Sequence, residues 1–450
     1  MFQRSILKFL RNWRNKPGRK PLIVRGARQV GKTTAVEMFG GEFTQFVSLN
    51  LEKEQDRQLF GRKLPVKELW QGLLLLKEKE SIPGETLLFL DEIQNSTEAI
   101  GYLRYFYEEI PDLHIIAAGS LFGVLVEPSK RGFPVGRVEY TDVMPMSFQE
   151  FLEAMDYSNA LELIRNEPIP DYAHDRLIKL FGEYTLAGGM PEVLKTYRDE
   201  RSIVALKPYY ESLIQSYKDD VVKYAGSKTV EQVLRHCIES APYEAGKRIK
   251  YEGFGQSSYS SRLVSQSLKL LQRAMLLTIV HPTTDIQIPL RPDYRKSPKL
   301  FYLDTGLLNY CLGIQGEFFI SDDLHDVYRG SVIEHIVFQE FQSIQAANKP
   351  VFWVRQKRQS SAELDALLVI DGTVTPVEIK SGKSGTLRSL HQFVERSECH
   401  FAVRLYTGQL KLETARTPSG KSFRLLNLPV YLASMIQEYV RHYRDSDASV

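Results

Sequence analysis

A glycine-rich segment near the N-terminus has the residue types and the spacing needed to bind phosphate groups. After the apolar run 22–24, Gly26 opens the pattern Gly-x-x-x-x-Gly-Lys-Thr, which ends at Thr33. Glycines allow backbone N–H groups to curl around phosphate oxygens, and the helix expected at 34–39 adds its dipole. This order of strand, glycine loop and helix is the context that a P-loop requires. The alternative is a glycine-rich turn without a ligand.

The pattern gives individual residues of this loop an expected role. Lys32 would reach the β- and γ-phosphates of a nucleoside triphosphate, and the Thr33 hydroxyl would ligate Mg²⁺. The predicted cofactors are therefore ATP and Mg²⁺. The residues predicted to bind the nucleotide are Gly26, Ala27, Arg28, Gln29, Val30, Gly31, Lys32, Thr33 and Thr34.

A second stretch has acidic residues where the same chemistry needs them. The apolar run 87–90 is followed directly by Asp91 and Glu92, which is the Walker B pattern. A continuous apolar run is typical of a parallel strand buried on both faces. Acids at the carboxyl end of such a strand lie where ligands bind in open α/β sheets. We expect Asp91 to hold the hydrated Mg²⁺ and Glu92 to orient or polarise the attacking water.

Two further residues are candidates for a role in catalysis. Ser120 follows the apolar run 114–118 and could contact the γ-phosphate or the lytic water. The alternative for Ser120 is a simple role at a strand-to-turn junction. Arg137 lies in an expected loop and could act in trans as an arginine finger in a homo-oligomer. The alternative for Arg137 is a solvated side chain.

Near the C-terminus, the Asp-Gly pair at 371–372 lies between two β-rich runs and is a strong hairpin signal. A two-residue loop would place Ile370 opposite Thr373. Counting outward in register then places Asp365 opposite Glu378, with Cβ atoms about 5 Å apart. Two carboxylates that face each other destabilise a sheet unless a cation compensates them.

A divalent metal ion bridged by Asp365 and Glu378 would supply that cation, as in metal-dependent phosphodiesterases. Lys380 shares their face of the hairpin and could activate water or stabilise the developing charge. Glu334, on the helix expected at 331–341, is the candidate third acid. The alternative is that Lys380 merely neutralises the acids in a salt-bridged surface hairpin.

The composition restricts the class of protein. The 450 residues carry a net charge of only +3, so any contact with nucleic acid must come from local patches. Three widely separated cysteines argue for a reducing compartment and against a disulfide framework or a zinc site. No apolar run approaches the length of a membrane-spanning helix.

We interpret the basic, amphipathic segment 2–13 as a short helix packed on the first domain. We expect a cytoplasmic protein without a membrane partner.

The middle of the chain contains two segments with different sequence patterns. Residues 150–225 contain no convincing strand and predict a helical region. From 228 to 320, two expected helices are followed by a small expected hairpin, which suggests a winged helix. Basic residues in this segment could contact phosphates, or they could form a solvated surface on a domain used only for packing.

Taken together, these segments resemble a family of bacterial and archaeal AAA-type ATPases that end in a nuclease-like domain. The resemblance covers essentially the whole chain. The motifs that carry it lie at 26–33, 88–94, 119–120, 136–137, 145–151, 188–192, 301–307 and 377–381.

The resemblance implies an α/β protein with four parts. These are an N-terminal parallel-sheet P-loop ATPase core (1–150), a helical lid (151–227), a winged-helix region (228–320) and a restriction-endonuclease-like PD-(D/E)xK domain (321–450). The matched nuclease positions are Glu334, Asp365, Glu378 and Lys380. One departure is that residues 251–261 are rich in glycine and serine, which weakens any inference of DNA readout there.

The expected function is that of an Mg²⁺-dependent ATPase whose nucleotide state moves the C-terminal module, with DNA as the expected partner. Two forms of this hypothesis remain open. In one, the C-terminal module cleaves DNA with a second divalent metal ion. In the other, the protein is a nucleotide-gated switch or scaffold whose C-terminal fold binds nucleic acid or protein without cleavage.

Overall fold

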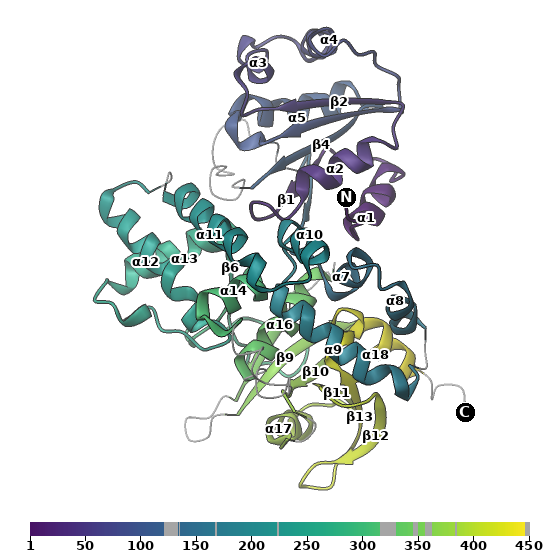
Figure 1. The fold of residues 1–450 in the computed structure, drawn as a ribbon, viewed down its shortest axis with the longest axis vertical. Helices are drawn as coiled ribbons and strands as arrows, with labels where there is room; N and C mark the ends of the chain where they lie inside the picture. Colours follow the sequence, from purple (N-terminus) through teal and green to yellow (C-terminus); the bar gives the residue numbers. More distant parts are fainter. Residues whose placement is uncertain are drawn as a thin grey trace. The chain divides into compact units, whose positions relative to one another are not determined.

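The computed structural model describes residues 1–120, 134, 136–166, 169–222, 225–315, 330–344, 350–355, 362–382 and 385–445. The chain forms two compact units (Figure 1). The first comprises Met1–Met144 with Leu270–Leu276, and the second comprises Pro145–Lys269 with Leu277–Val450. In the described part of the chain, no helix is long and apolar enough to cross a lipid bilayer.

The first unit is built on a five-stranded parallel sheet in the order β2-β3-β4-β1-β5. Because β1 and β3 both pair with β4 in parallel, the carboxyl ends of all three strands reach the same edge of the sheet. The strands are β1 (Leu22–Arg25), β2 (Gln45–Asn50), β3 (Thr86–Asp91), β4 (His114–Gly119) and β5 (Glu139–Asp142). The helices are α1 (Ile6–Arg14), α2 (Lys32–Gly40), α3 (Glu54–Arg57), α4 (Val66–Leu76) and α5 (Thr97–Glu109), with short 3-10 turns η1 (Phe60–Arg62) and η2 (Ile93–Asn95).

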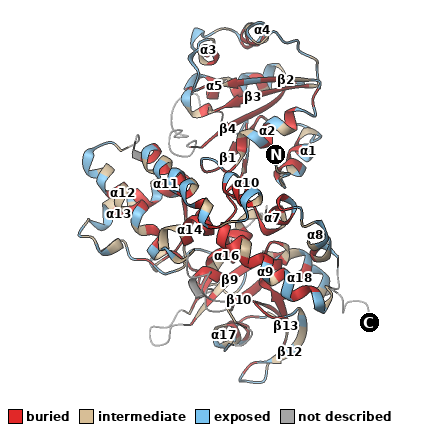
Figure 2. Cartoon of the chain, viewed as in Figure 1, coloured by how far each residue is buried: buried red, intermediate tan, exposed pale blue. Residues whose placement is uncertain are grey.

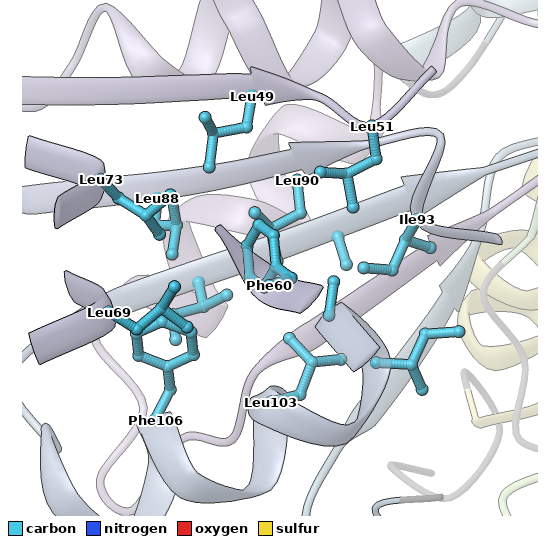
Figure 3. Close-up of a cluster of buried hydrophobic side chains, with 14 of the residues drawn as sticks. Leu49, Leu51, Phe60, Leu69, Leu73, Leu88, Leu90, Ile93, Leu103 and Phe106 are labelled. Atoms are coloured by element: carbon cyan, nitrogen blue, oxygen red, sulfur yellow. The ribbon is translucent and has the colours of Figure 1, made fainter. Parts of the chain in front are cut away.

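Every residue of β3 and β4 is buried, as expected for parallel strands covered on both faces. On one face, α4 and α5 pack their apolar side chains against the sheet, as Figure 3 shows for Leu69, Leu73, Leu103 and Phe106. Helix α2 packs against β3 and β4, and α1 packs against α2. This core holds the carboxyl edge of the sheet in a fixed position.

The amphipathic N-terminal segment forms the expected helix. In α1, the side chains of Ile6, Leu7, Leu10 and Trp13 are buried. Just before the helix, the guanidinium of Arg4 donates hydrogen bonds to two backbone carbonyl oxygens of the same unit, those of Val30 at 2.7 Å and Met144 at 2.8 Å. The helix is therefore part of the folded unit and is tied directly to the glycine-rich loop.

The second unit combines a helical region with two sheets. Its described residues between 151 and 222 contain no strand, as the sequence predicts. The helices are α7 (Phe148–Ala154), α8 (Ser158–Arg165), α9 (Asp171–Ala187), α10 (Pro191–Glu200), α11 (Lys207–Val222), α12 (Lys228–Glu244), α13 (Ser261–Arg273, whose last residues belong to the first unit), α14 (Thr305–Leu312), α16 (Gly330–Ser343), α17 (Arg388–Arg396) and α18 (Ile436–Asp445). Short 3-10 segments are η3 (Val204–Leu206), η4 (Phe254–Gln256) and η6 (Val430–Met435).

The smaller sheet of this unit pairs β6 (Leu277–Val280) with β7 (Lys299–Tyr302) in antiparallel register. It follows α12 and α13 in the chain, which is the expected order of two helices and a hairpin. The assignment of this segment to the winged-helix class remains a prediction.

The larger sheet is mixed and has the order β12-β13-β11-β10-β9-β8. Its central strands are almost wholly buried (Figure 2). Its strands are β8 (Val351–Val354), β9 (Glu363–Ile370), β10 (Thr373–Ile379), β11 (Phe401–Tyr406), β12 (Lys411–Arg416) and β13 (Ser422–Pro429). Parallel pairs β10–β11 and β11–β13 are flanked by antiparallel pairs.

The hairpin between β9 and β10 has the predicted register. Ile370 pairs with Thr373, and the ladder continues outward to Ala366 and Val377. The turn residues have φ of 49° and 75°, the left-handed conformation that a two-residue type I′ turn requires and that an Asp-Gly pair adopts readily. The predicted hairpin is confirmed.

A buried carboxylate ties the helices of the second unit together. Glu340 on α16 is fully buried, and it accepts hydrogen bonds from the Tyr184 hydroxyl at 2.7 Å and from the Phe148 N–H at 3.1 Å. Tyr184 lies on α9, and Phe148 begins α7. Burial raises the pKa of Glu340 to about 7, against the lowering effect of these two donors.

Candidate functional site

The glycine-rich loop connects β1 to α2 and has little room for side chains. A Cβ atom on Gly26 would lie 2.5 Å from the Val143 carbonyl oxygen and 2.9 Å from Cγ2 of Val30. Gly31 caps the start of α2 with a φ of 91°, which glycine adopts without strain. The first and last glycines of the motif are therefore required by the backbone geometry.

Lys32 is buried at the start of α2. Its ammonium donates hydrogen bonds to the carbonyl oxygens of Gly26 at 3.0 Å and Ala27 at 2.8 Å. Burial lowers the pKa of Lys32 to about 8, although the nearby carboxylates of Glu92 and Asp91 act to raise it. The lysine is thus held over the loop, beside both acids of the Walker B pattern.

The structure brings Thr33 and Asp91 together. The Thr33 hydroxyl donates a hydrogen bond of 2.9 Å to Oδ2 of Asp91, at the carboxyl end of β3. Burial raises the pKa of Asp91, while the hydrogen bonds from Thr33 and from the Glu92 N–H lower it. A hydroxyl and a carboxylate at this separation form an oxygen donor set of the kind that Mg²⁺ prefers. These two residues fit a magnesium ion.

Glu92 directly follows β3 in an unusual backbone conformation. Its φ is 52°, which is uncommon for a residue with a side chain and directs the carboxylate to a position the extended strand would not reach. The carboxylate accepts a hydrogen bond from the Gln94 amide. Burial raises the pKa of Glu92, and the Gln94 hydrogen bond lowers it. Gln94 ends the motif at 88–94, but its residue type alone did not predict this contact with Glu92.

The other candidates of the first unit lie as follows. Ser120 is buried and follows β4, at the same edge of the sheet as the glycine-rich loop. Arg137 is exposed, and its Nε donates to Oε1 of Glu108 at 2.9 Å. In the loop, Arg28 and Gln29 are exposed, as is Thr34 on the first turn of α2.

The acids predicted near the C-terminus lie around one end of the β9–β10 hairpin. Asp365 accepts a hydrogen bond of 2.7 Å from the Ile379 N–H. Lys380 pairs with Oε1 of Glu378 at 2.6 Å. Oε2 of Glu378 is buried and has no hydrogen-bond partner among the described residues. Burial raises the pKa of both carboxyl groups, Asp365 and Glu378.

Lys299, one of the basic residues of the segment 228–320 that could contact phosphates, is buried and reaches these acids. The ammonium of Lys299, on β7, forms ion pairs with Glu334 and with Oε1 of Glu363, the latter at 2.8 Å. Its side chain is 3% exposed, and its ammonium lies 5.1 Å from the centre of the Phe352 ring. Burial lowers the pKa of Lys299, but the surrounding carboxylates outweigh this effect, so that its pKa is raised overall. We call Lys299, Glu334, Glu363, Asp365, Glu378 and Lys380 the acidic centre.

Lysine side chains compensate part of the negative charge of the acidic centre. Among the described residues, no group of three or more histidine, cysteine, aspartate or glutamate side chains is arranged to hold a metal. Glu334 and Glu378 are instead paired with lysines. The metal-binding roles of Asp365 and Glu378 therefore stay predictions.

Comparison with protein families separates the chain into three parts. Residues 18–152 match the model of a family described as an AAA domain. Residues 178–317 and 329–431 match two families that are each described as a domain of unknown function, DUF8612 and DUF4143. Residues 18–152 are an AAA-type P-loop ATPase domain. The sequence resemblance is confirmed for this part, whereas the match of the C-terminal part is to a domain of unknown function.

Several solved structures are similar to the chain. The Walker-type ATPase PABY2304 of Pyrococcus abyssi has 15% identity and a TM-score of 0.45, over 69% of this chain and 96% of that one. The ORC2 protein of Aeropyrum pernix, in ADPNP-ADP complexes, has 14% identity and a TM-score of 0.34, over 70% and 93%. The ORC1 protein of Aeropyrum pernix, in complex with DNA, has 11% identity and a TM-score of 0.30, over 70% and 92%.

These TM-scores lie below 0.5, so the AAA assignment depends on the family match and the site geometry. Among curated protein sequences, none matched the chain.

Proposed function

We propose that this protein is an Mg²⁺-dependent ATPase, and that ATP binding and hydrolysis in its first unit control a C-terminal module that binds or cleaves DNA. The observation that supports the ATPase most directly is the hydrogen bond between Thr33 and Asp91. It places the two expected magnesium ligands side by side, next to a lysine that can reach phosphate oxygens.

In this proposal, the chain's own residues divide the reaction between them. Lys32 exchanges its hydrogen bonds to the loop carbonyls for bonds to the β- and γ-phosphate oxygens of ATP. Thr33 and Asp91 hold magnesium, which when bound neutralises charge on the phosphates. Glu92 orients the attacking water and accepts its proton, a role that its half-buried carboxylate and raised pKa favour.

Replacing Thr33 tests this assignment. Thr33→Ala removes the hydroxyl that faces Asp91, and we expect ATP turnover to fall by about 100-fold at fixed magnesium. Thr44→Ala is a suitable control, because Thr44 is an exposed threonine of the same unit. Phosphate release from ATP is the measurement. Wild-type turnover in Thr33→Ala would contradict the proposed magnesium site.

Two further roles extend the proposal. Ser120 contacts the γ-phosphate or the attacking water, and Arg137 acts in trans within a homo-oligomer. Arg137 must then give up its ion pair with Glu108. Specific ATP turnover measured against protein concentration tests this role. Specific turnover that rises with concentration in the wild-type protein but not in Arg137→Ala would support the role in trans. Specific turnover that is equal in the two proteins and independent of concentration would contradict it.

The C-terminal module allows two candidate functions. In the first, Glu334, Asp365, Glu378 and Lys380 form a nuclease centre. In the second, the module binds nucleic acid or protein without cleavage, and ATP acts as a switch. The ion pairs of Lys299 favour the second candidate, because they occupy carboxylates that a nuclease would use for metal.

Incubating the purified protein with plasmid, ATP and either Mg²⁺ or Mn²⁺ separates these candidates. Metal-dependent cutting that is lost in both Asp365→Ala and Glu378→Ala would establish the nuclease. DNA binding that weakens steeply with salt, without cutting, would establish the second candidate with DNA as partner. A lack of salt-sensitive DNA binding, again without cutting, would point to a protein partner.

A further inference from the structure

Lys299 belongs to a different part of the chain from the acids that it contacts. It lies on β7, within the segment 178–317 that matches one family, whereas Glu334 and Glu363 lie in the segment 329–431 that matches another. The lysine of one family segment thus neutralises carboxylates of the next. Both segments belong to the second compact unit.

The position of Lys299 is fixed by the fold on several sides. Strand β7 pairs with β6, which sets Lys299 opposite Val280. Farther along β7, Phe301 stacks on Phe338 of α16 at 3.8 Å between ring centres. The Tyr302 N–H also donates to Nε2 of His335 at 2.9 Å. Since α16 also carries Glu334, the lysine and its acid are held by the same packed elements.

The ammonium and a metal ion would need the same oxygen atoms. Glu334 and Glu363 both direct carboxylate oxygens at the ammonium of Lys299. Asp365 lies two residues after Glu363 on β9 and therefore on the same face of the sheet. A divalent ion at this position would lie beside a buried positive charge, and the repulsion between two cations is strong where water is excluded.

The surroundings also suit an ammonium ion. The Phe352 ring lies 5.1 Å from the Lys299 nitrogen, and the face of an aromatic ring attracts a cation. Arg248 lies 3.7 Å from Glu363, so that this acid is shared between two basic residues. Each carboxylate that Lys299 contacts is thus compensated within the chain.

We propose that Lys299 is the resident cation of the acidic centre, so that the protein binds no divalent metal ion there. Removing the charge of Lys299 creates a divalent-cation site from the freed carboxylates. This inference is independent of ATP hydrolysis in the first unit, because its readout is metal binding in the absence of nucleotide. It favours the second candidate function, in which the module binds its partner without cleavage.

Titration of the full-length protein with Mn²⁺, followed by the electron paramagnetic resonance signal of the free ion, tests the proposal. We expect Asp365→Asn to leave the Mn²⁺ binding of the wild-type protein unchanged. We expect Lys299→Met to gain one Mn²⁺ site. The Mn²⁺ affinity of this site should be at least about tenfold higher than that of any Mn²⁺ site in the wild-type protein that depends on Asp365. The gain should disappear in the double variant Lys299→Met/Asp365→Asn. Lys299→Arg retains the charge and should gain no site, and Lys296→Met is the control for loss of a neighbouring lysine.

Two results would overturn the proposal. One is a wild-type Mn²⁺ site that Asp365→Asn abolishes, and this comparison remains decisive even if Lys299→Met fails to fold. The other is a folded Lys299→Met that gains no Mn²⁺ site. Asparagine is close to aspartate in shape and retains an oxygen that can accept the Ile379 N–H, so we expect Asp365→Asn to fold.

Discussion

The Thr33 hydroxyl lies 2.9 Å from Oδ2 of Asp91, although 58 residues separate the two positions in the chain. The parallel sheet causes this contact, because β1 and β3 both end at the edge where α2 begins. The residue pair joins the glycine-rich loop to the Walker B strand. In the proposed magnesium site each element supplies one oxygen ligand, so neither motif alone would hold the ion.

Glu92→Gln should bind ATP and hydrolyse it slowly, with turnover reduced by about 100-fold or more, because glutamine cannot accept a proton from water. Burial raises the pKa of Glu92 above the ordinary value of 4.5. Since the base acts when deprotonated, wild-type turnover should increase with pH through a value above 4.5, and the variant should lack this increase. Turnover at saturating ATP across a pH series is the measurement. Wild-type turnover in Glu92→Gln would remove Glu92 from this role.

Gly26→Ala should displace the glycine-rich loop. The added methyl group would meet the Val143 carbonyl oxygen at 2.5 Å, and overpacking of this kind costs about 1–3 kcal/mol of stability. We expect a lower melting temperature and ATP binding weakened at least about tenfold. Gly61→Ala is the matched control, since a Cβ atom there meets nothing within 4 Å. Equal ATP affinity in the two variants would contradict the tight packing of the loop.

Glu340 should make the second unit less stable as the pH rises. Burial raises its pKa to about 7 in the folded state, above the ordinary 4.5 expected after unfolding. The folded state therefore binds the proton more tightly, and up to about 3 kcal/mol of stability should be lost between these two pH values. Glu340→Gln should remove this loss while keeping an acceptor for Tyr184. Denaturant unfolding of the wild-type protein and of Glu340→Gln across this pH range measures the change in the free energy of unfolding. An identical pH dependence in the two proteins would contradict the raised pKa of Glu340.

The sequence predicted the strand, glycine-rich loop and helix of the first unit, and the buried strand before Asp91, because these residues lie in short, continuous motifs. The loop from Gly26 to Thr33 needs only its own backbone to form, and the buried strand before Asp91 has a distinctive apolar run. The hairpin register could be predicted for a similar reason, since the turn residues at 371–372 determine which residues pair.

Lys299 could not be predicted in this way. Its contact with Glu334 spans 35 residues and depends on how β7 packs against α16. A lysine in a strand has no sequence signal that names its partner. The pattern at Asp365 and Glu378 therefore indicated the acids of this region but not Lys299, whose ammonium pairs with Glu334 and Glu363. Gln94 was missed for a related reason, because only the left-handed backbone at Glu92 brings the two side chains together.

The most direct test of the account is ATP turnover by Lys32→Ala, measured as phosphate release in the presence of Mg²⁺. Lys32 donates hydrogen bonds to two carbonyl oxygens of the glycine-rich loop, and in the proposed mechanism its ammonium binds the β- and γ-phosphates directly. We predict that turnover is abolished while the circular dichroism spectrum and cooperative unfolding of the protein are retained. Hydrolysis at the wild-type rate in the folded variant would contradict the central claim.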